Sequence, residues 1–438
     1  MQVKVLKFGG SSLADAEQMK KVAAIVNADP ACRYVIPSAP GKRFSGDDKV
    51  TDLLYRCYEL SRNEEDIGDV FEIIKERYRD IIRGLGIDFS LEEEFKTIEM
   101  SILNHAGRDY IASRGEYLNG LILANYLGFK FLDAAKCIFF KENGSFDAEL
   151  TNEKLAARLA KYERAVIPGF YGSMPNGTIK TFSRGGSDIT GAIVARAAEA
   201  DIYENWTDVS GFLMADPRIV ENPKSIDVIT YRELRELAYM GATVLHDESI
   251  FPVRYAGIPI NIRNTNDPSA KGTMIVSSIK DATDKSVITG IAGKTGISII
   301  FMEKDMMNAE LGFGRRVLQV IEDNGISFEH LPSGVDTLSI VVHTAALEGK
   351  REKVLAELRQ AVCPDTLNIE DGYALIAVVG RRMVAAKGTA QRVFRAVADA
   401  DVNIKMIDQG SSEMDIIIGV HKSDYKTAIN AIYHEFEK

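Results

Sequence analysis

The stretch Lys4-Val5-Leu6-Lys7-Phe8-Gly9-Gly10-Ser11-Ser12-Leu13 lies at the start of the sequence and decides the fold. Its apolar, β-branched beginning is typical of a buried strand, and the two glycines end that strand. Ser11 or Ser12 can then cap a helix. The buried face of that helix is supplied by Leu13, Ala16, Met19, Val22 and Ala23. The stretch therefore predicts a strand, a glycine turn and a helix in direct succession.

A junction of this kind can hold an anion. The N-terminus of a helix presents free backbone N–H groups, and glycines let a phosphate approach the backbone closely. Lys7, at the end of the predicted strand, would add a positive charge beside it. Many strand–glycine–helix junctions bind nothing, so the stretch alone suggests a phosphate site without establishing one.

The composition narrows the class of protein. A chain of 438 residues is long enough for two or three domains. Its net charge of −10 provides no field that would attract nucleic acid or an anionic membrane surface. The four cysteines show no CxxC spacing, which argues against a metal knuckle or a disulfide scaffold. Because neither a membrane span nor a signal peptide is evident, we expect a cytoplasmic protein without nucleic-acid or membrane partners.

Strands and helices alternate as far as about residue 275, and a glycine-rich or polar loop follows several of the strands. These loops occupy residues 38–41, 169–172, 183–191 and 207–211, and a helix is expected over 189–200. The alternation predicts a mostly parallel sheet with helices on both faces. Ligands of such sheets bind at the carboxyl ends of the strands, so we expect the loops to gather around one site.

An internal repeat follows a polar boundary at residues 276–286. A shift of 76 residues, without a gap, places Gly312 on Gly388 and Ile340-Val341-Val342 on Ile416-Ile417-Ile418. Each copy is predicted to contain a strand, a helix, two strands and a helix. The repeat therefore predicts two small α/β modules in the C-terminal part of the chain.

Taken together and in order, the sequence blocks resemble the aspartate kinase (aspartokinase) family of the amino acid kinase superfamily, over nearly the whole chain. The matching blocks are Lys7-Phe8-Gly9-Gly10-Ser11, Ser38-Ala39, Thr51-Asp52-Leu53-Leu54, Gly115-Glu116, Gly169-Phe170, Arg184-Gly185-Gly186-Ser187-Asp188, Thr207-Asp208-Val209, Asp216-Pro217-Arg218, Gly241-Ala242 and Val244-Leu245-His246. The paired repeats are similar to the tandem ACT repeats of this family, which bind amino acid effectors.

The resemblance implies a three-layer αβα amino acid kinase fold over residues 1–278, followed by two ferredoxin-like α+β ACT repeats, 286–364 and 365–438. The implied reaction moves the γ-phosphate of ATP to the β-carboxylate of L-aspartate and gives aspartyl phosphate, the entry to lysine, threonine and methionine synthesis. A free carboxylate is ionised at neutral pH, so no general base is needed. Catalysis must then come from positioning two anions and neutralising their charge.

By resemblance, Lys7 contacts the transferring phosphoryl group, with Gly9, Gly10 and Ser11 beside it. Asp188 would orient Lys7 or lie near the metal. The alternatives are an ordinary surface lysine for Lys7 and an N-cap or first-turn acid for Asp188.

The substrate is expected in the same place. By resemblance, Arg184 holds the α-carboxylate of aspartate with two parallel hydrogen bonds, and Glu116 binds the α-ammonium group. Ser38, Thr51 and Ser187 would line the pocket. A helix-start charge favoured by the dipole is the alternative explanation for Glu116.

Thr207, Asp208, Asp216 and Arg218 resemble nucleotide contacts, and a helix cap or an Asp-Pro turn are the alternatives. Mg²⁺ is expected mainly on the ATP phosphates and on water, with no protein ligand assigned. Two positions depart from the family pattern. Thr243 replaces a lysine that contacts the nucleotide phosphates, and Leu213 replaces an aromatic residue near the nucleotide.

By resemblance, the first ACT repeat binds its effector, lysine or threonine or both, near Met307, Ser327, Phe328 and Glu329. The alternatives are a core position for Phe328 and a helix stop for Ser327. ACT repeats of this family pair between subunits, so a homodimer or a larger assembly is expected.

The sequence can be compared with three other functions. Another amino acid kinase, such as a glutamate kinase, would lack the paired repeats and the block around Arg184. A non-catalytic or weakly catalytic amino acid sensor is favoured by Thr243 but disfavoured by the presence of Lys7, Glu116, Arg184 and Asp188. A fusion with homoserine dehydrogenase is not expected, because the sequence ends with the second repeat.

Overall fold

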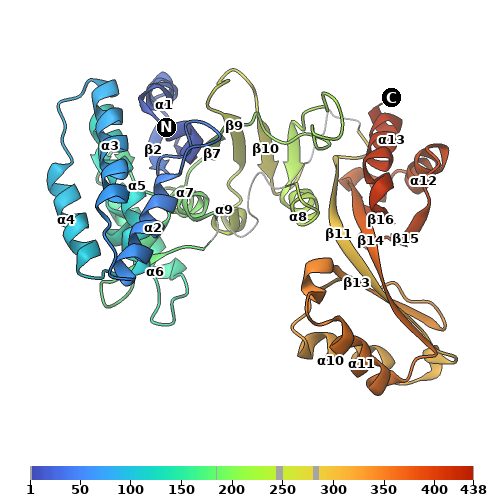
Figure 1. Ribbon diagram of the computed structural model, residues 1–438. Coiled ribbons are helices and arrows are strands. Elements are labelled where there is room, and N and C mark those ends of the chain that lie inside the picture. Colours follow the sequence, from blue (N-terminus) through green and yellow to red (C-terminus); the bar gives the residue numbers. More distant parts are fainter. Residues whose placement is uncertain (1, 184, 243–249, 280–285, 438) are drawn as a thin grey trace. The chain divides into compact units, whose positions relative to one another are not determined.

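The structure is a computed structural model that describes residues 2–183, 185–242, 250–279 and 286–437. The chain divides into two compact units (Figure 1). The first comprises Met1–Phe212, Ser225–Tyr231 and Val244–Lys280, and the second Leu213–Lys224, Arg232–Thr243 and Asp281–Lys438. The expected domain limits at 278, 286 and 364 remain predictions.

The first unit is built on an eight-stranded sheet in the order β3-β4-β2-β1-β7-β9-β10-β8. All neighbouring strands are parallel except β9 and β10, so the prediction of a mostly parallel sheet is confirmed. The strands are β1 (Lys4–Phe8), β2 (Cys32–Pro37), β3 (Lys130–Phe131), β4 (Ala165–Val166), β7 (Ile202–Thr207), β8 (Val228–Thr230), β9 (Ile260–Asn264) and β10 (Thr273–Val276), with a separate hairpin of β5 (Tyr171–Ser173) and β6 (Ile179–Thr181).

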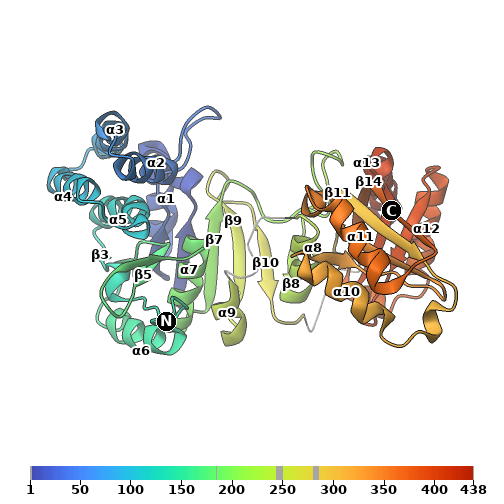
Figure 2. The same ribbon diagram turned by 60° about the horizontal axis from the view of Figure 1, so that its bottom comes forward.

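Helices cover both faces of this sheet. Helices α1 to α5 pack together in one layer, and α6, α7 and α9 form the other (Figure 2). The helices are α1 (Ala16–Ala28), α2 (Val50–Arg62), α3 (Gly68–Leu85), α4 (Glu92–Leu103), α5 (Arg108–Leu127), α6 (Ala148–Leu159), α7 (Gly186–Ala197) and α9 (Phe251–Ala256). This arrangement is the expected three-layer αβα architecture.

Two local predictions were wrong. Neither Ser11 nor Ser12 caps α1, because a 3₁₀ helix (Gly10–Leu13) intervenes and the Asp15 side chain accepts the capping bond from Gln18 N instead. Helix α7 begins at Gly186 rather than at 189, because Gly185 takes up the left-handed conformation (φ 67°) that ends the loop. In both places a helical turn begins earlier than expected, at Gly10 after β1 and at Gly186 in α7, so the preceding loops are shorter than predicted.

The second unit is built on a six-stranded antiparallel sheet in the order β12-β13-β11-β14-β16-β15. The strands are β11 (Gly290–Glu303), β12 (Phe328–His330), β13 (Thr337–His343), β14 (Thr366–Val379), β15 (Ile404–Asp408) and β16 (Asp415–His421). The helices are α8 (Tyr231–Tyr239), of which residues 232–239 belong to this unit, α10 (Phe313–Asp323), α11 (Arg351–Val362), α12 (Thr389–Asp399) and α13 (Tyr425–Glu437). Each repeat therefore has the predicted order of strand, helix, two strands and helix.

The two repeats share their longest strands. Residues 297–303 of β11 pair with β13, whereas residues 290–295 pair only with the end of β14 that lies beside β16. The start of β11 thus completes the sheet of the second repeat, and the start of β14 completes that of the first (Figure 1). The repeats are consequently interlocked rather than strung one after the other.

The gap-free alignment of the repeats was wrong in its second half. In the sheet, Ile297 pairs with His343 and Tyr373 with His421. His343 therefore corresponds to His421, so Ile340-Val341-Val342 matches residues 418–420 rather than 416–418. Two residues are added between β15 and β16.

No helix in the described part of the chain is both long and apolar enough to span a membrane.

Candidate active site

Lys7 lies on the face of the sheet opposite to the α1–α5 layer. Its neighbours Leu6 and Phe8 are buried in the core of that layer, and successive strand residues point to opposite faces. The Lys7 ammonium group therefore faces α7. Its Nζ lies 2.6 Å from Asp188 Oδ1 and 3.5 Å from Asn205 Oδ1. Lys7 itself is almost completely buried, which excludes an ordinary surface lysine.

Asp188 lies in the first turn of α7 and is held by β7. Asn205 Nδ2 donates to Asp188 Oδ1 over 2.9 Å, and the Tyr203 hydroxyl donates to the Asp188 backbone carbonyl over 3.0 Å. A carboxylate in a first helical turn is also favoured by the helix dipole. Asp188 is therefore a first-turn acid and the partner of Lys7 at once, two roles that the sequence allowed to hold together.

A cavity of about 220 Å³ opens beside this ion pair. Its lining includes six residues that the sequence predicted, namely Lys7, Ser38, Thr51, Glu116, Ser187 and Asp188. Phe170, Ser183, Gly185 and Gly186 complete the lining. Arg184, expected to hold the α-carboxylate, lies outside the described residues, between two residues that line the cavity.

Glu116 of α5 brings a buried carboxyl group with one unpaired oxygen to this cavity. The residue is only 5% exposed, and no group among the described residues hydrogen-bonds to its Oε2. Burial raises the pKa of Glu116 to about 8, despite a backbone hydrogen bond from Ala39 and the charge of Arg114, which lower it. A buried carboxylate without a counter-charge is costly. A ligand ammonium group would supply that charge.

Phe170 packs tightly against the start of α7. A Cβ atom on Gly186 would lie 2.4 Å from Phe170 Cδ2, so only glycine fits there. Phe170 has a positive φ of 80°, and its N–H donates to Thr190 Oγ1 over 3.0 Å. Strained non-glycine residues gather at functional sites, and Phe170 lies on the wall of the cavity.

The glycine turn after β1 is pressed against the loop after β2. Gly41 N donates to the Gly10 carbonyl over 2.8 Å, and a Cβ atom on Gly41 would lie 2.6 Å from the Gly10 carbonyl carbon. Gly9 N donates to the Trp206 carbonyl over 3.0 Å. These contacts leave no room for a side chain at Gly10 or Gly41, so no side chain at these two positions keeps a phosphate from the backbone.

A buried ion pair fixes the loop that carries Gly41. Arg77 of α3 is 3% exposed and its Nη2 lies 2.7 Å from Asp47 Oδ2, while its Nη1 donates to the Gly41 carbonyl over 3.1 Å. Arg43 makes a second ion pair with Asp47 over 2.9 Å. The hydrogen bonds and charges of the two arginines lower the pKa of Asp47 below its usual range. The loop is therefore tied to α3 as well as to the glycine turn.

The predicted nucleotide contacts fall in both units. Thr207 ends β7 in the first unit, and its hydroxyl donates to the adjacent Asp208 carboxylate over 3.1 Å. Asp216 and Arg218 belong to the second unit, where they form an exposed ion pair of 2.6 Å. Arg218 N also donates to Asp216 Oδ1 over 2.8 Å, as in the Asp-Pro turn considered from the sequence. Thr243 lies outside the described residues.

Three of the predicted effector residues lie around the start of β12, and the fourth, Met307, begins a 3₁₀ helix (Met307–Ala309). Met307 is buried in the core of the first repeat, whereas Ser327 and Phe328 are exposed. The exposure of Phe328 argues against a core position. The Glu329 side chain is only 7% exposed and pairs with Lys294.

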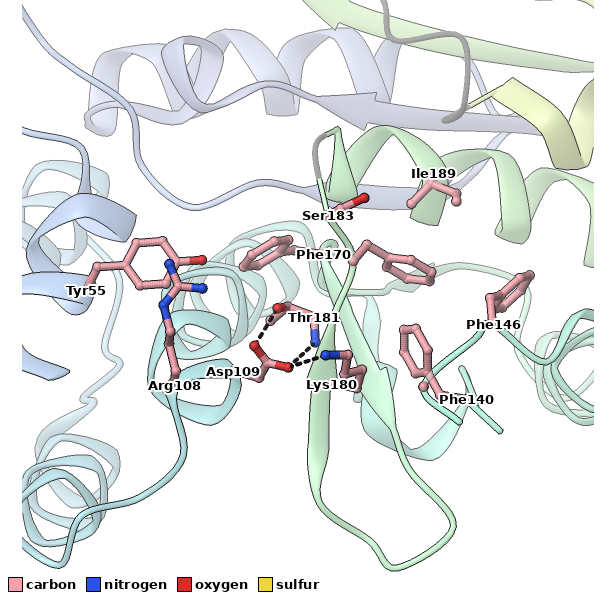
Figure 3. A pocket seen from close by; sticks show the side chains of 12 residues that line it. Tyr55, Arg108, Asp109, Phe140, Phe146, Phe170, Lys180, Thr181, Ser183 and Ile189 are labelled. Atoms are coloured by element: carbon pink, nitrogen blue, oxygen red, sulfur yellow. Dashed lines mark hydrogen bonds and ion pairs between the residues drawn. The ribbon is translucent and has the colours of Figure 1, made fainter. Parts of the chain in front are cut away.

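A larger cavity of about 600 Å³ shares Phe170 and Ser183 with the first (Figure 3). Rings of the β5–β6 region, including Phe140 and Phe146, line one side of it. On the other side Asp109 binds Lys180 over 3.3 Å and accepts from the Thr181 hydroxyl over 2.9 Å. Nothing in the sequence predicted this cavity.

Sequence reasoning also missed Asn205 and the Arg77–Asp47 pair. Asn205 is a buried polar residue in a strand of mostly buried residues, a pattern that could have marked it. No comparable signal existed for Arg77, because its partner lies 30 residues away in an irregular loop.

Comparisons with known proteins agree with this geometry. Residues 2–264 match the amino acid kinase family and residues 376–436 match the ACT domain. The chain is 40% identical to aspartokinase 3 of Bacillus subtilis (strain 168), over 99% of this chain and 98% of that protein.

Solved structures give the same picture. The aspartate kinase of Clostridium acetobutylicum superimposes with a TM-score of 0.93 at 51% identity, covering 100% of both chains. E. coli aspartokinase III, solved with aspartate and ADP and also with lysine and aspartate, gives a TM-score of 0.76 at 25% identity, again covering 100% of both chains.

Proposed function

The chain belongs to the amino acid kinase family and, within it, to the aspartokinases, and from this membership we propose that it transfers the γ-phosphate of ATP to the β-carboxylate of L-aspartate. The observation that carries the proposal is the cavity that has Lys7 and Glu116 in one lining. It offers an ammonium group to an incoming anion and a carboxyl group without a counter-charge to an incoming cation. L-Aspartate carries both kinds of charge.

In the proposed complex, the aspartate ammonium group binds Glu116 and its β-carboxylate points toward Lys7. Ser38, Thr51 and Ser187 line the remaining wall, and Arg184 binds the α-carboxylate. The ammonium ion stabilises the ionised form of Glu116 and so removes the cost of burying that carboxylate. The role of Arg184 is proposed from its chemistry alone, because a planar guanidinium group can donate two parallel hydrogen bonds to a carboxylate.

The β-carboxylate is itself the nucleophile, so the protein need not remove a proton. Lys7 neutralises the charge that gathers on the phosphoryl oxygens in the transition state. Asp188 and Asn205 hold the Lys7 ammonium group in place before substrates bind, so little reorganisation is needed during the reaction. Asp188 is thus a positioning residue in this proposal.

ATP is proposed to bind with its phosphates at the turn formed by Gly9, Gly10 and Ser11, and to contact Thr207 and Asp208 of the same unit. Asp216 and Arg218 of the second unit remain predicted nucleotide contacts. The Gly10–Gly41 contact supports this, because a Cβ atom would obstruct the turn. The described residues contain no group of three or more His, Cys, Asp or Glu side chains arranged to hold a metal. Because Mg²⁺ prefers phosphate and water oxygens, we propose that it is bound mainly by the ATP phosphates and water, where it neutralises phosphate charge.

Regulation by lysine or threonine, binding near Met307, Ser327, Phe328 and Glu329, is part of the same proposal, as are a homodimer formed through the ACT repeats and a cytoplasmic location. The buried Glu329 carboxylate supports the effector site, because it can receive an ammonium group. Light scattering with and without lysine tests the dimer. A protein that is monomeric under both conditions would contradict it.

An assay of ADP release tests the proposed reaction. We expect turnover with L-aspartate and at most a few per cent of that rate with L-glutamate. Turnover preferring L-glutamate would contradict the substrate assignment. No turnover with either, together with tight binding of an amino acid, would instead support the sensor alternative that Thr243 favours.

A further inference from the structure

Three elements converge on the carboxylate of Glu329 in the first ACT repeat. The Lys294 ammonium group of β11 forms an ion pair with it. The Tyr239 hydroxyl of α8 hydrogen-bonds to it, and His343 Nε2, at the end of β13, lies 3.2 Å from Glu329 Oε1. Lys294 also reaches Tyr239 directly, since its Nζ lies 4.2 Å from the ring centroid and 3.4 Å from the backbone carbonyl.

The ion pair is largely shielded from water. The side chains of Lys294 and Glu329 are 13% and 7% exposed. Burial alone would raise the pKa of Glu329, but the hydrogen bonds from Lys294 and Tyr239 and the nearby positive charges outweigh it and lower this pKa. Glu329 is therefore an ionised carboxylate whose counter-charge comes from its own chain.

The second repeat contains the same pair with the charges exchanged. The 76-residue shift places Lys294 on Glu370 and Glu329 on Lys405, and these two side chains also pair, over 2.7 Å. The equivalence holds in three dimensions, because the left-handed glycines that follow, Gly296 (φ 77°) and Gly372 (φ 84°), also correspond. The second pair is more exposed, at 37% for Lys405 and 29% for Glu370.

The exchange has a chemical consequence. In the first repeat the carboxylate lies on β12, an edge strand of the sheet, and in the second repeat an ammonium group takes that place on β15. An amino acid that offers an ammonium group can be received only at the first of these two positions. At the second it would meet a like charge.

We propose that Lys294 is an internal competitor for the effector: its ammonium group occupies the Glu329 carboxylate when the site is empty, and an amino acid effector binds by replacing it. This inference rests on the effector site of the proposed function. The effector class is an amino acid whose α- or side-chain ammonium group reaches Glu329.

Two effects follow from this competition. The effector binds more weakly than the site would otherwise allow, because part of its binding free energy is used to break the internal pair. When an effector displaces the Lys294 ammonium group from Glu329, the contacts of Lys294 with Tyr239 are also lost, so that helix α8 loses a link to β11. Helix α8 directly follows β8, a strand of the sheet in the first unit. The helix that contacts the effector site is therefore covalently continuous with that sheet.

Calorimetric titration of the full chain with L-lysine and L-threonine, without ATP or aspartate, tests the proposal. We expect K294M to bind an effector at least about tenfold more tightly than the wild type, because Glu329 is left without a counter-charge. K294R, which keeps the charge, should stay within about threefold of the wild type, and E329Q should lose binding. Thermal melts establish that each variant is folded.

K405M is the matched control, because it removes the lysine of the corresponding ion pair in the second repeat. Its affinity for the effector should stay within about twofold of the wild type. Unchanged or weakened binding in K294M, equal tightening in K405M, or no binding by any folded variant would overturn the proposal. ADP release measured without effector reports on the phosphotransfer reaction separately, so failure of that reaction can be told apart from failure of the competition.

Discussion

At the scale of single residues, the proposed mechanism depends on whether two buried ionisable groups, Lys7 and Glu116, have partners in the free protein. Lys7 is paired before any substrate arrives, whereas Glu116 Oε2 is left without a partner among the described residues. The first is a preorganised electrostatic group, and the second is a carboxyl group that an incoming ammonium group would stabilise in its ionised form. Both properties can be tested by single substitutions.

Lys7→Ala should lower kcat for aspartate phosphorylation by about 10²–10³-fold or more, because a preorganised charge at the transition state is lost. The fold should persist, since α7 and β7 keep their other contacts. Lys154→Ala removes an exposed lysine of α6 and should leave kcat unchanged. A Lys7→Ala enzyme within tenfold of the wild type would remove Lys7 from the mechanism.

Glu116 should make substrate binding depend on pH. Since its pKa in the free protein is raised to about 8, kcat/KM for aspartate should rise with pH and level off above that value, where the carboxylate is ionised. In Glu116→Gln this rise should vanish and KM for aspartate should increase. Glu149→Gln, an exposed acid on α6, is the control and should keep the wild-type profile.

The Glu116 carboxyl group should affect stability in the opposite direction: as pH rises, activity increases but the free energy of unfolding decreases. A carboxyl group whose pKa is higher in the folded than in the unfolded protein binds more protons when folded, so the free energy of unfolding falls as pH rises between the two pKa values. Thermal melts without ligand should show Glu116→Gln gaining stability over the wild type between about pH 5 and pH 8. A difference that does not change with pH would contradict the raised pKa of Glu116.

At the scale of elements, the loop after β2 is positioned by α3 through Arg77. Breaking a buried ion pair costs about 3–5 kcal/mol, because one charge is left unpaired, so Arg77→Met should destabilise the protein by that order. It should also raise KM for ATP more than KM for aspartate, since Gly41 packs on Gly10. Denaturant unfolding and initial rates measure the two effects.

A double variant separates charge from packing. Arg77→Met combined with Asp47→Leu removes both charges of the pair and should recover most of the lost stability. The stability supplied by ionised Asp47 is present above its unfolded pKa near 4 and is lost as pH falls, since its pKa is lowered in the fold. Equal destabilisation in the single and double variants would contradict the ionic role.

Many elements of the fold could be predicted from periodicity, and the failures have local causes. The breaks between α2, α3 and α4 follow the charged and glycine positions in the sequence. The cap of α1 was misplaced because Ser11 and Ser12 entered a 3₁₀ turn, and a serine signal cannot distinguish that turn from a cap. The sharing of β11 and β14 could not be foreseen, because a repeat alignment reveals similar segments but not which strands pair.

At the scale of the whole molecule, the sequence predicted the residues that line the site better than the residues that hold those lining residues in place. Six predicted residues line one cavity, because parallel strands bring loops from distant parts of the chain to one edge of the sheet. Asn205 and Arg77 were missed because each acts through a contact that only the folded chain creates. The interlocking of the two repeats was missed for the same reason, because it arises from the pairing of β11 with β14 in the folded chain.

The central claim is that this chain phosphorylates the β-carboxylate of L-aspartate in the cavity between Lys7 and Glu116. Incubation with ATP, Mg²⁺, L-aspartate and hydroxylamine, followed by mass spectrometry and NMR, identifies which carboxyl group was activated, because an acyl phosphate is trapped as its hydroxamate. We predict the β-hydroxamate from the wild type and none from Lys7→Ala. ADP release without a hydroxamate, or formation of the α-hydroxamate, would contradict the account.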